Sequence, residues 1–297
     1  MGSLSHLNTI DCQQGAVRAV RFNVDGSYCL TCGSDKKLKL WNPRTGLLLK
    51  TYFGHGDEVL DAQGSCDSCH VVSASKDKSI IYWDVSTGQP LRRLRVHAGA
   101  VNCVRFNEDS SIAVSGSNDN TVMCWDIRTR KNEPVQTMKD AKDIIRSLIV
   151  SESKIITSSL DGSIRTYDIR NGELTTDTIG EQITYITITK DSQCILAACS
   201  DNVIRLIDTD SGDLLQEYKG HDTKDFHIEC GVIENDTKII SGSVQGFVHV
   251  WDLLEGKEVN KIAVGAHIVH SLSTHPTGKE ILFARKNEIQ LWGPPDS

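Results

Sequence analysis

Short stretches of alternating apolar and polar residues, separated by polar turns, run through the chain. The clearest is 113–126, AVSGSNDNTVMCWD, in which an apolar run leads into the turn residues 118–120 and a second alternating run ends at Trp125. Alternation with a period of two is the pattern of a half-buried strand, and Asn and Asp favour tight turns. This stretch therefore predicts a strand, a turn and a second strand.

The same ending recurs at a nearly constant interval. Residues that align with Trp125 lie about 40–45 residues apart, and all five tryptophans of the chain are among them. The aligned positions are Trp41, Trp83, Trp125, Tyr167, Ile207, Trp251 and Trp292. Such an interval, with four short strands per unit, is typical of the blades of a β-propeller.

In sequence, the units resemble the repeats of the WD-repeat β-propeller family, in which a strand of each blade ends in Trp-Asp. The resemblance covers essentially the whole chain and implies an all-β fold, with residues 1–297 forming a single seven-bladed domain. The last unit stops shortly after Trp292 and lacks an outer strand, whereas residues 6–11 form a strand candidate before the first unit. We expect this N-terminal strand to pair into the last blade, which closes the ring and covers a sheet edge.

Blades of this family are held by hydrogen bonds that link a His, a Ser or Thr, an Asp and the Trp. Carried over by position, the set in blade 2 is His55, Ser73, Asp77 and Trp83, and the set in blade 3 is His97, Ser115, Asp119 and Trp125. Blade 1 has Thr31, Asp35 and Trp41 but no matching His, and blade 6 has His221, Ser241 and Trp251 with Gln245 in place of Asp. The same residue types form catalytic triads, but recurrence from blade to blade favours a structural role, because an active site is normally built once.

Composition narrows the classes of partner. A formal net charge of -7 and a pI of about 5.8 argue against a large nucleic-acid-binding face, because such faces are rich in Lys and Arg. The sequence has neither an apolar run long enough to span a membrane nor the pattern of a signal peptide. The ten cysteines are then expected to be reduced and mostly buried. We expect a cytoplasmic and nuclear protein that binds other proteins as a monomer within larger complexes.

One cysteine motif resembles a haem-attachment site. Cys66-Asp-Ser-Cys69-His70 matches the pattern of covalent haem attachment. It falls in a predicted turn between two strands of blade 2, and the sequence indicates neither a second axial ligand nor further zinc ligands nearby, so a thiol-rich surface turn is the preferred interpretation. Because the sequence also has no Gly-rich phosphate loop and no HExxH motif, it predicts no enzyme activity, no cofactor and no metal site.

Partner residues on propellers usually lie in the loops at one face of the ring. By analogy with the family, two positions around the start of each first strand and the residue before each Asp turn point to this face; blade 6 contributes His227 and Glu229 in this alignment. The predicted partner-binding residues are Arg18, Leu60, Lys76, Asn102, Asn118, Ile144, Arg146, Leu160 and Arg285. Cations with apolar neighbours suggest a basic mouth that takes a partner segment with acidic or phosphorylated residues beside an apolar anchor. The alternative is that these are scattered surface cations that only solvate the face.

A narrower resemblance suggests a function. Residues 15–65, 99–106 and 212–221 are closely similar to one group of WD-repeat scaffolds, the mitogen-activated protein kinase organizers. The resemblance implies a non-catalytic scaffold that assembles components of the extracellular-signal-regulated (MAP) kinase cascade. Members are also found with the spliceosome, so a protein-binding subunit for pre-mRNA splicing is an alternative.

A third possibility comes from the paired endings Trp125-Asp-Ile-Arg128 and Tyr167-Asp-Ile-Arg170. They resemble endings in propellers that serve as substrate receptors of cullin-based ubiquitin ligases. An Arg at this place also forms surface ion pairs of little energetic consequence, so the motif leaves the question open.

Overall fold

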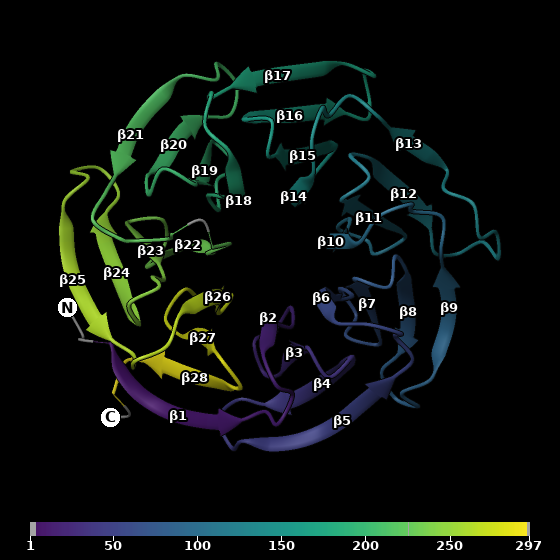
Figure 1. Ribbon diagram of the computed structural model, residues 1–297, viewed down its shortest axis with the longest axis horizontal. Helices are drawn as coiled ribbons and strands as arrows, with labels where there is room; N and C mark the ends of the chain where they lie inside the picture. Colours follow the sequence, from purple (N-terminus) through teal and green to yellow (C-terminus); the bar gives the residue numbers. More distant parts are fainter. Residues whose placement is uncertain (1–3, 225, 296–297) are drawn as a thin grey trace.

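The ring of blades is visible in a computed structural model that describes residues 4–224 and 226–295 (Figure 1). Within these residues, 28 strands form seven four-stranded antiparallel sheets around a central axis. In six of the sheets the first strand in the chain lies next to the centre and the last lies at the rim; in the sheet that contains both chain ends, β26 lies next to the centre and β1 at the rim. The seven-bladed, all-β propeller predicted from the spacing is therefore confirmed.

Within each blade the strands follow from the centre outward. Blade 1 consists of β2 (Val17–Phe22), β3 (Cys29–Gly33), β4 (Lys37–Asn42) and β5 (Leu47–Phe53). Blade 2 consists of β6 (Val59–Gly64), β7 (His70–Ser75), β8 (Ile80–Asp84) and β9 (Pro90–Leu94). Blade 3 consists of β10 (Val101–Phe106), β11 (Ile112–Ser117), β12 (Val122–Asp126) and β13 (Gln136–Met138).

The remaining blades follow the same order. Blade 4 consists of β14 (Ile145–Ser151), β15 (Lys154–Ser159), β16 (Ser163–Asp168) and β17 (Leu174–Thr178). Blade 5 consists of β18 (Ile183–Ile188), β19 (Cys194–Cys199), β20 (Ile204–Asp208) and β21 (Leu214–Tyr218). Blade 6 consists of β22 (Cys230–Ile233), β23 (Lys238–Ser241), β24 (Phe247–Asp252) and β25 (Glu258–Ala263). Blade 7 consists of β26 (Val269–Thr274), β27 (Ile281–Arg285), β28 (Glu288–Gly293) and β1 (Ser5–Asp11).

Blade 7 is completed by the two ends of the chain. Strand β1 pairs antiparallel with β28, with Ile10 opposite Ile289, and Figure 1 shows the purple N-terminal strand alongside the yellow C-terminal one. Ile10 is buried and packs with Trp41 of blade 1 and Leu291 of blade 7. The predicted closure of the ring by the N-terminal strand is confirmed.

The apolar core is a ring of clusters, each shared by two neighbouring blades. The cluster between blades 2 and 3, for example, contains Val72 and Leu94 from one blade and Val104 and Trp125 from the other. Burial falls toward the rim, since β3 is buried throughout whereas most of β5 is exposed. Each blade thus covers its apolar faces only when both neighbours are present, as in other repeat architectures.

The turn between the second and third strands has one conformation in several blades. Residues Lys78 and Asn120 adopt positive φ angles of 70° and 65°, and each follows an Asp whose side chain accepts a backbone N–H from two residues further on. Short polar side chains of this kind satisfy turn backbone that would otherwise lack a partner. The Asp therefore shapes the turn that carries residues of the predicted partner-binding face.

The cysteines are all free thiols within the described residues. Most are buried, and burial raises the pKa of Cys103 to about 12. Cys66 and Cys69 are exposed in the turn between β6 and β7, where the sequence places a thiol-rich surface turn. Within the described part of the chain, the structure contains no helix with the length and apolar character needed to cross a membrane.

Candidate functional site

The predicted polar set of blade 3 is joined by hydrogen bonds. His97 places Nδ1 at 2.9 Å from Asp119 Oδ2 and Nε2 at 2.8 Å from Ser115 Oγ, and Trp125 Nε1 donates to the same hydroxyl at 2.9 Å. Burial alone would raise the pKa of Asp119, but hydrogen bonds from His97 and Thr121 hold that pKa well below its ordinary value. The set ties the leading loop, the Asp turn and the third strand together in the blade interior.

Blade 2 repeats this geometry. His55 Nε2 lies 2.7 Å from Ser73 Oγ, its Nδ1 lies 3.3 Å from Asp77 Oδ2, and Trp83 Nε1 donates to Ser73 at 2.8 Å. His55 and Ser73 are both buried. The hydroxyl and the imidazole thus lie in the blade interior, where they are bonded to each other and to the indole.

In blade 1 a glutamine takes the place of the histidine, which sequence reasoning missed. Trp41 Nε1 donates to Thr31 Oγ1 at 2.9 Å, and the Thr31 hydroxyl donates in turn to the side-chain oxygen of Gln14. Gln14 is completely buried, and its amide lies 3.5 Å from Asp35 Oδ1. Gln14 stands one residue nearer to its first strand than His55 and His97 do, so matching by position did not find it.

Blade 6 retains the His, the Ser and the Trp but not their linkage. The Trp251 indole donates to the backbone carbonyl of Lys219 at 3.0 Å, and the Ser241 hydroxyl lies 3.4 Å from the Glu229 carbonyl. Neither ring nitrogen of His221 has a hydrogen-bond partner among the described residues, and burial lowers the pKa of this His to about 4. Gln245 stands at the Asp position, and the incomplete set that the sequence indicates for this blade is not joined by hydrogen bonds among the described residues.

This difference predicts unequal effects of the same substitution. We expect Ser115→Ala to lower the free energy of unfolding by about 2–3 kcal/mol, because it leaves His97 Nε2 and the Trp125 indole N–H buried without a partner. Ser241→Ala is the matched control, because the Ser241 hydroxyl binds neither the His221 ring nor the Trp251 indole. We expect it to lower the free energy of unfolding by about 1 kcal/mol or less. Urea unfolding followed by tryptophan fluorescence measures both; equal losses would contradict a structural role for the blade 3 set.

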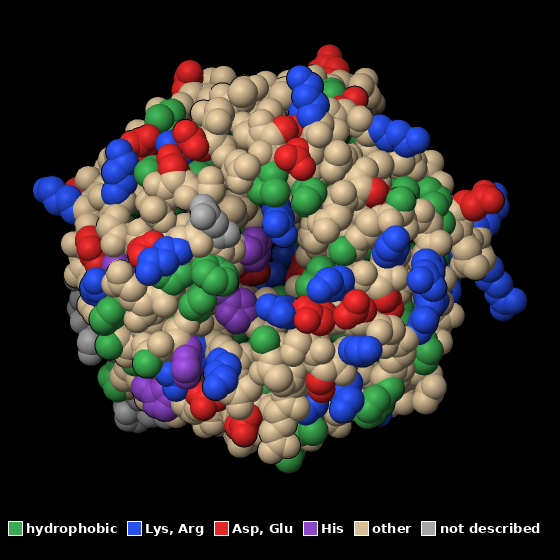
Figure 2. Space-filling view, viewed as in Figure 1, with side chains coloured by type: hydrophobic (Ala, Val, Ile, Leu, Met, Phe, Trp, Pro, Cys, Tyr) green, Lys and Arg blue, Asp and Glu red, His purple; other side chains and the backbone are tan. Residues whose placement is uncertain are grey.

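The candidate binding site is a cavity of about 400 Å³ at the centre of the ring, here called the mouth. Six of the nine predicted partner-binding residues line it: Arg18, Leu60, Lys76, Asn102, Asn118 and Arg146. Figure 2 shows the hollow, with Lys, Arg and His side chains at its edge. Ile144 and Leu160 are not part of this lining, and Arg285 lies beside a second, smaller hollow where its guanidinium pairs with Glu288. The structure thus gathers residues from several blades but leaves these three aside.

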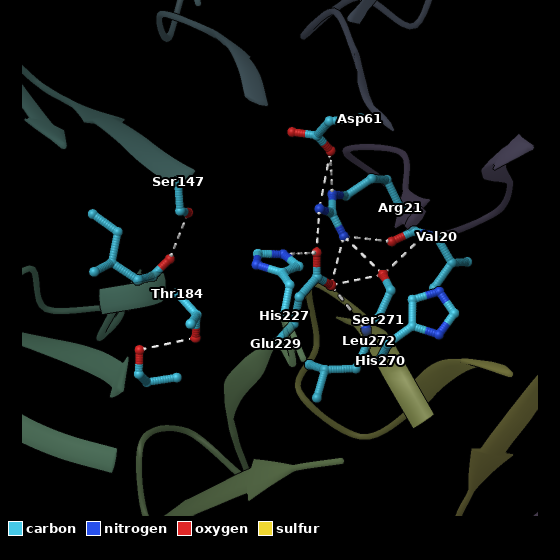
Figure 3. Close-up of polar contacts among 12 residues, drawn as sticks. Val20, Arg21, Asp61, Ser147, Thr184, His227, Glu229, His270, Ser271 and Leu272 are labelled. Atoms are coloured by element: carbon cyan, nitrogen blue, oxygen red, sulfur yellow. Dashed lines mark hydrogen bonds and ion pairs between the residues drawn. The ribbon is translucent and has the colours of Figure 1, made fainter. Parts of the chain in front are cut away.

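A buried ion cluster forms the floor of the mouth (Figure 3). Arg21 donates from both Nη atoms to Glu229, at 2.6 and 2.9 Å, and from Nε to Asp61 at 3.0 Å. Arg105 pairs with the other oxygen of Asp61. Burial alone would raise the pKa of Glu229, but the Arg21 guanidinium holds it below its ordinary value. The cluster is therefore two cations paired with two carboxylates, with no net charge.

The carboxylates of this cluster also hold neighbouring blades together. Asp61 of blade 2 accepts the backbone N–H of Val104 in blade 3 at 3.2 Å, and Glu229 of blade 6 accepts that of Leu272 in blade 7 at 2.9 Å. Ser271 of blade 7 accepts the N–H of Val20 in blade 1 at 3.1 Å. An innermost strand has one edge without a strand partner, and these side chains satisfy N–H groups that would otherwise be unpaired.

Sequence reasoning missed Arg21, Asp61 and Arg105, and it placed Glu229 incorrectly. Glu229 was aligned as a residue of the partner-binding face, whereas its side chain is 2 % exposed and belongs to the cluster. The pairing of Cys230 with Ser241 matches that of Ala62 with Ser73, so Glu229 corresponds to Asp61, not to Leu60. One available signal was that Arg21 and Arg105 occupy the same place in the similar strands VRAVRF and VNCVRF.

The charge on the rim of the mouth differs from that on its floor. Arg18 pairs with Glu58 at 3.0 Å, with both side chains partly exposed. Arg146 and Lys76 line the mouth without an ion-pair partner among the described residues, and burial lowers the pKa of Arg146. The unneutralised positive charge of the mouth thus lies on these two residues.

The two Asp-Ile-Arg endings lie elsewhere. Arg128 pairs with Asp126 at 3.1 Å and Arg170 is exposed; both follow third strands at the end opposite the Asp turns. They are not part of the mouth lining. Among the described residues, no group of three or more His, Cys, Asp or Glu side chains could hold a metal ion.

Comparison with known proteins agrees with this geometry. Residues 4–42, 46–84 and 88–126 match the family described as WD domain, G-beta repeat, and the three matches end where β4, β8 and β12 end. WD repeat domain-containing protein 83 of Rattus norvegicus is 60% identical over 96% of this chain and 91% of the relative. The protein of the same name in Homo sapiens is 57% identical over the same shares, and the Dictyostelium discoideum homolog is 35% identical over 94% of each chain. The chain therefore belongs to the WD-repeat family.

Proposed function

We propose that this protein is a non-catalytic scaffold that holds components of a MAP kinase cascade together through the mouth of the propeller. The observation that carries the proposal is the mouth itself, where Arg146 and Lys76 stand without ion-pair partners among the described residues and Leu60 lines the same cavity. Unpaired cations next to apolar side chains favour recognition of acidic protein segments. The kinase cascade comes from the sequence resemblance.

The catalytic alternatives have no support in the geometry. The recurring His, Ser and Asp side chains are buried and bonded to tryptophans in blades 2 and 3, as described above. The charged groups on the floor of the mouth are paired with one another. A scaffold needs a rigid binding surface that a partner can recognise. The closed ring of packed blades provides the rigidity, and the mouth provides the surface.

Affinity capture from cell extract tests the proposal. We expect wild-type protein to recover kinases of the cascade, and the double variant Arg18→Glu/Arg146→Glu to recover them at least about tenfold less, because two mouth cations become carboxylates. The matched control is Arg128→Glu/Arg170→Glu, which makes the same charge change away from the mouth. Circular dichroism verifies that each variant is folded.

The recovered proteins also decide between the alternatives. Splicing factors without kinases would replace the signalling role by a role in pre-mRNA splicing. A cullin adaptor lost in the Arg128→Glu/Arg170→Glu variant would assign the protein to a ubiquitin ligase. Equal recovery of all partners by wild type and the mouth variant would overturn the mouth as the binding surface. A cytoplasmic and nuclear location is part of the proposal and is tested by imaging the tagged full-length chain.

A further inference from the structure

We propose that Arg146 and Lys76 form a subsite for a phosphorylated serine or threonine side chain of a partner protein. This inference rests on the proposed scaffold function and names the chemistry that the mouth recognises. Three points support it. Most cations of the mouth are already paired with carboxylates, the two cations that are unpaired among the described residues line the same cavity, and a ligand that neutralises both must carry about two negative charges.

Most cations of the mouth are not free to bind an anion. All three nitrogen atoms of the Arg21 guanidinium already donate hydrogen bonds, because both Nη atoms bind Glu229 and Nε binds Asp61. Arg105 shares Asp61 with it. Figure 3 shows Arg21 facing Glu229 and Asp61, with Leu272 and Ser271 completing the contacts of Glu229. Arg18 on the rim is paired with Glu58.

Arg146 is the exception within the described residues. It follows Ile145, the first residue of β14, lines the mouth, is half-buried and has no carboxylate within ion-pair distance. A guanidinium that is partly removed from water without a paired carboxylate is costly, and burial lowers its pKa although the charge of the nearby Asp143 opposes this shift. A ligand anion bound there would recover the lost interaction energy.

Lys76 supplies the second unpaired charge. It precedes the Asp turn of blade 2, is exposed and lines the same cavity, again without an ion pair among the described residues. A carboxylate would neutralise one of the two cations, whereas a phosphate monoester carries nearly two negative charges at neutral pH. Arginine also matches phosphate oxygens with a planar pair of N–H donors. The charge balance therefore favours phosphate over carboxylate.

The other groups of the mouth fit a peptide side chain. His227 lines the cavity with its Nδ1 atom buried and without a hydrogen-bond partner among the described residues, and Phe226 is 51% exposed on the same cavity. Burial lowers the pKa of His227, so at neutral pH the ring is uncharged and offers a single N–H. The cavity of about 400 Å³ accommodates a side chain and its neighbours on an extended segment.

The test uses four degenerate peptide libraries that differ only in a fixed central residue: phosphoserine, phosphothreonine, glutamate or serine. Each library is passed over immobilised full-length protein, and the retained peptides are quantified by mass spectrometry. We expect the two phosphorylated libraries to be retained at least about tenfold more than the serine library, and more than the glutamate library. Arg146→Gln and Lys76→Gln should each abolish this preference, whereas Arg170→Gln, a loss of one cation away from the mouth, should retain it.

Three outcomes would overturn the subsite. They are equal retention of all four libraries, greater retention of glutamate than of phosphoserine, and a preference that survives Arg146→Gln in protein with unchanged circular dichroism. A parallel capture from phosphatase-treated extract separates this inference from the scaffold function. Equal recovery of partners with and without the treatment would contradict the phosphate subsite and leave the scaffold function standing. Retention of phosphopeptides without capture of any partner would support the subsite and contradict the scaffold function.

Discussion

Deletion of residues 1–11 should leave a chain that cannot form a closed ring and that loses its cooperative unfolding transition. The deletion removes β1, the outer strand of blade 7, and with it Ile10 from the cluster between blades 7 and 1. It also exposes the edge of β28, which β1 covers along most of its length. Because every apolar cluster is shared by two blades, losing the closure weakens both neighbours, and an open edge invites aggregation.

Thermal unfolding and light scattering of the purified chain check this result. A milder variant keeps the prediction testable if the deletion does not fold: Ile10→Ala should cost about 2–4 kcal/mol of unfolding free energy, because it opens a gap in a buried cluster. Leu214→Ala is the control, since Leu214 is 54% exposed on an outer strand. An unchanged unfolding temperature in the deletion variant would show that the ring does not need its closing strand.

Breaking the ion cluster on the floor of the mouth should have the second large effect. Arg21→Ala is expected to lower the free energy of unfolding by about 3–5 kcal/mol, because it leaves the buried carboxylate of Glu229 without its guanidinium and leaves Asp61 paired with Arg105 alone. Arg18→Ala removes a partly exposed ion pair with Glu58 and should cost less than about 1 kcal/mol. Equilibrium unfolding in urea compares the two, and similar costs would contradict the view that the buried cluster joins the blades.

The same cluster sets a pH dependence with a definite sign. The pKa of Glu229 is lower in the folded protein than its ordinary value of 4.5, so the folded state favours the ionised carboxylate. Its contribution to stability is complete above about pH 4.5 and disappears as the pH falls through the lower, folded-state pKa. Glu229→Gln should therefore be less stable than wild type at neutral pH, and the difference should shrink in acid. A constant difference across this range would exclude a paired, ionised Glu229.

The strand pattern and the blade count could be read from the sequence because they depend on local, repeated features. An alternating run buries one face wherever it lies, and an Asp turn forms from residues adjacent in the chain. The Trp at the end of the third strand, replaced by Tyr167 and Ile207 in two blades, recurs at the interval that one blade requires. The closing strand could be predicted in the same way. The last blade lacks a fourth strand in the sequence, and the unassigned N-terminal strand can cover the sheet edge that this leaves open.

The sets in blades 2 and 3 were also within reach of the sequence, because four residues at matching positions identify them. Gln14 was not identified as the blade 1 counterpart of the histidine, because it is a different residue type at a shifted position. Only the fold shows that its side-chain amide reaches Thr31. The blade 6 set already lacks its Asp in the sequence, and only the structure shows how its other members are arranged. Its His, Ser and Trp are present, but the Trp251 indole finds a backbone carbonyl in place of Ser241.

The sequence by itself determined the architecture, the position of each blade and six of the residues that line the mouth. Which of those residues carry free charge was decided only by tertiary structure. Arg21 and Glu229 are far apart in the chain, yet they meet at the centre and neutralise each other. Arg146 is left without a partner among the described residues. An ion pair depends on distances between side chains from different blades, and no pattern within one repeat encodes those distances.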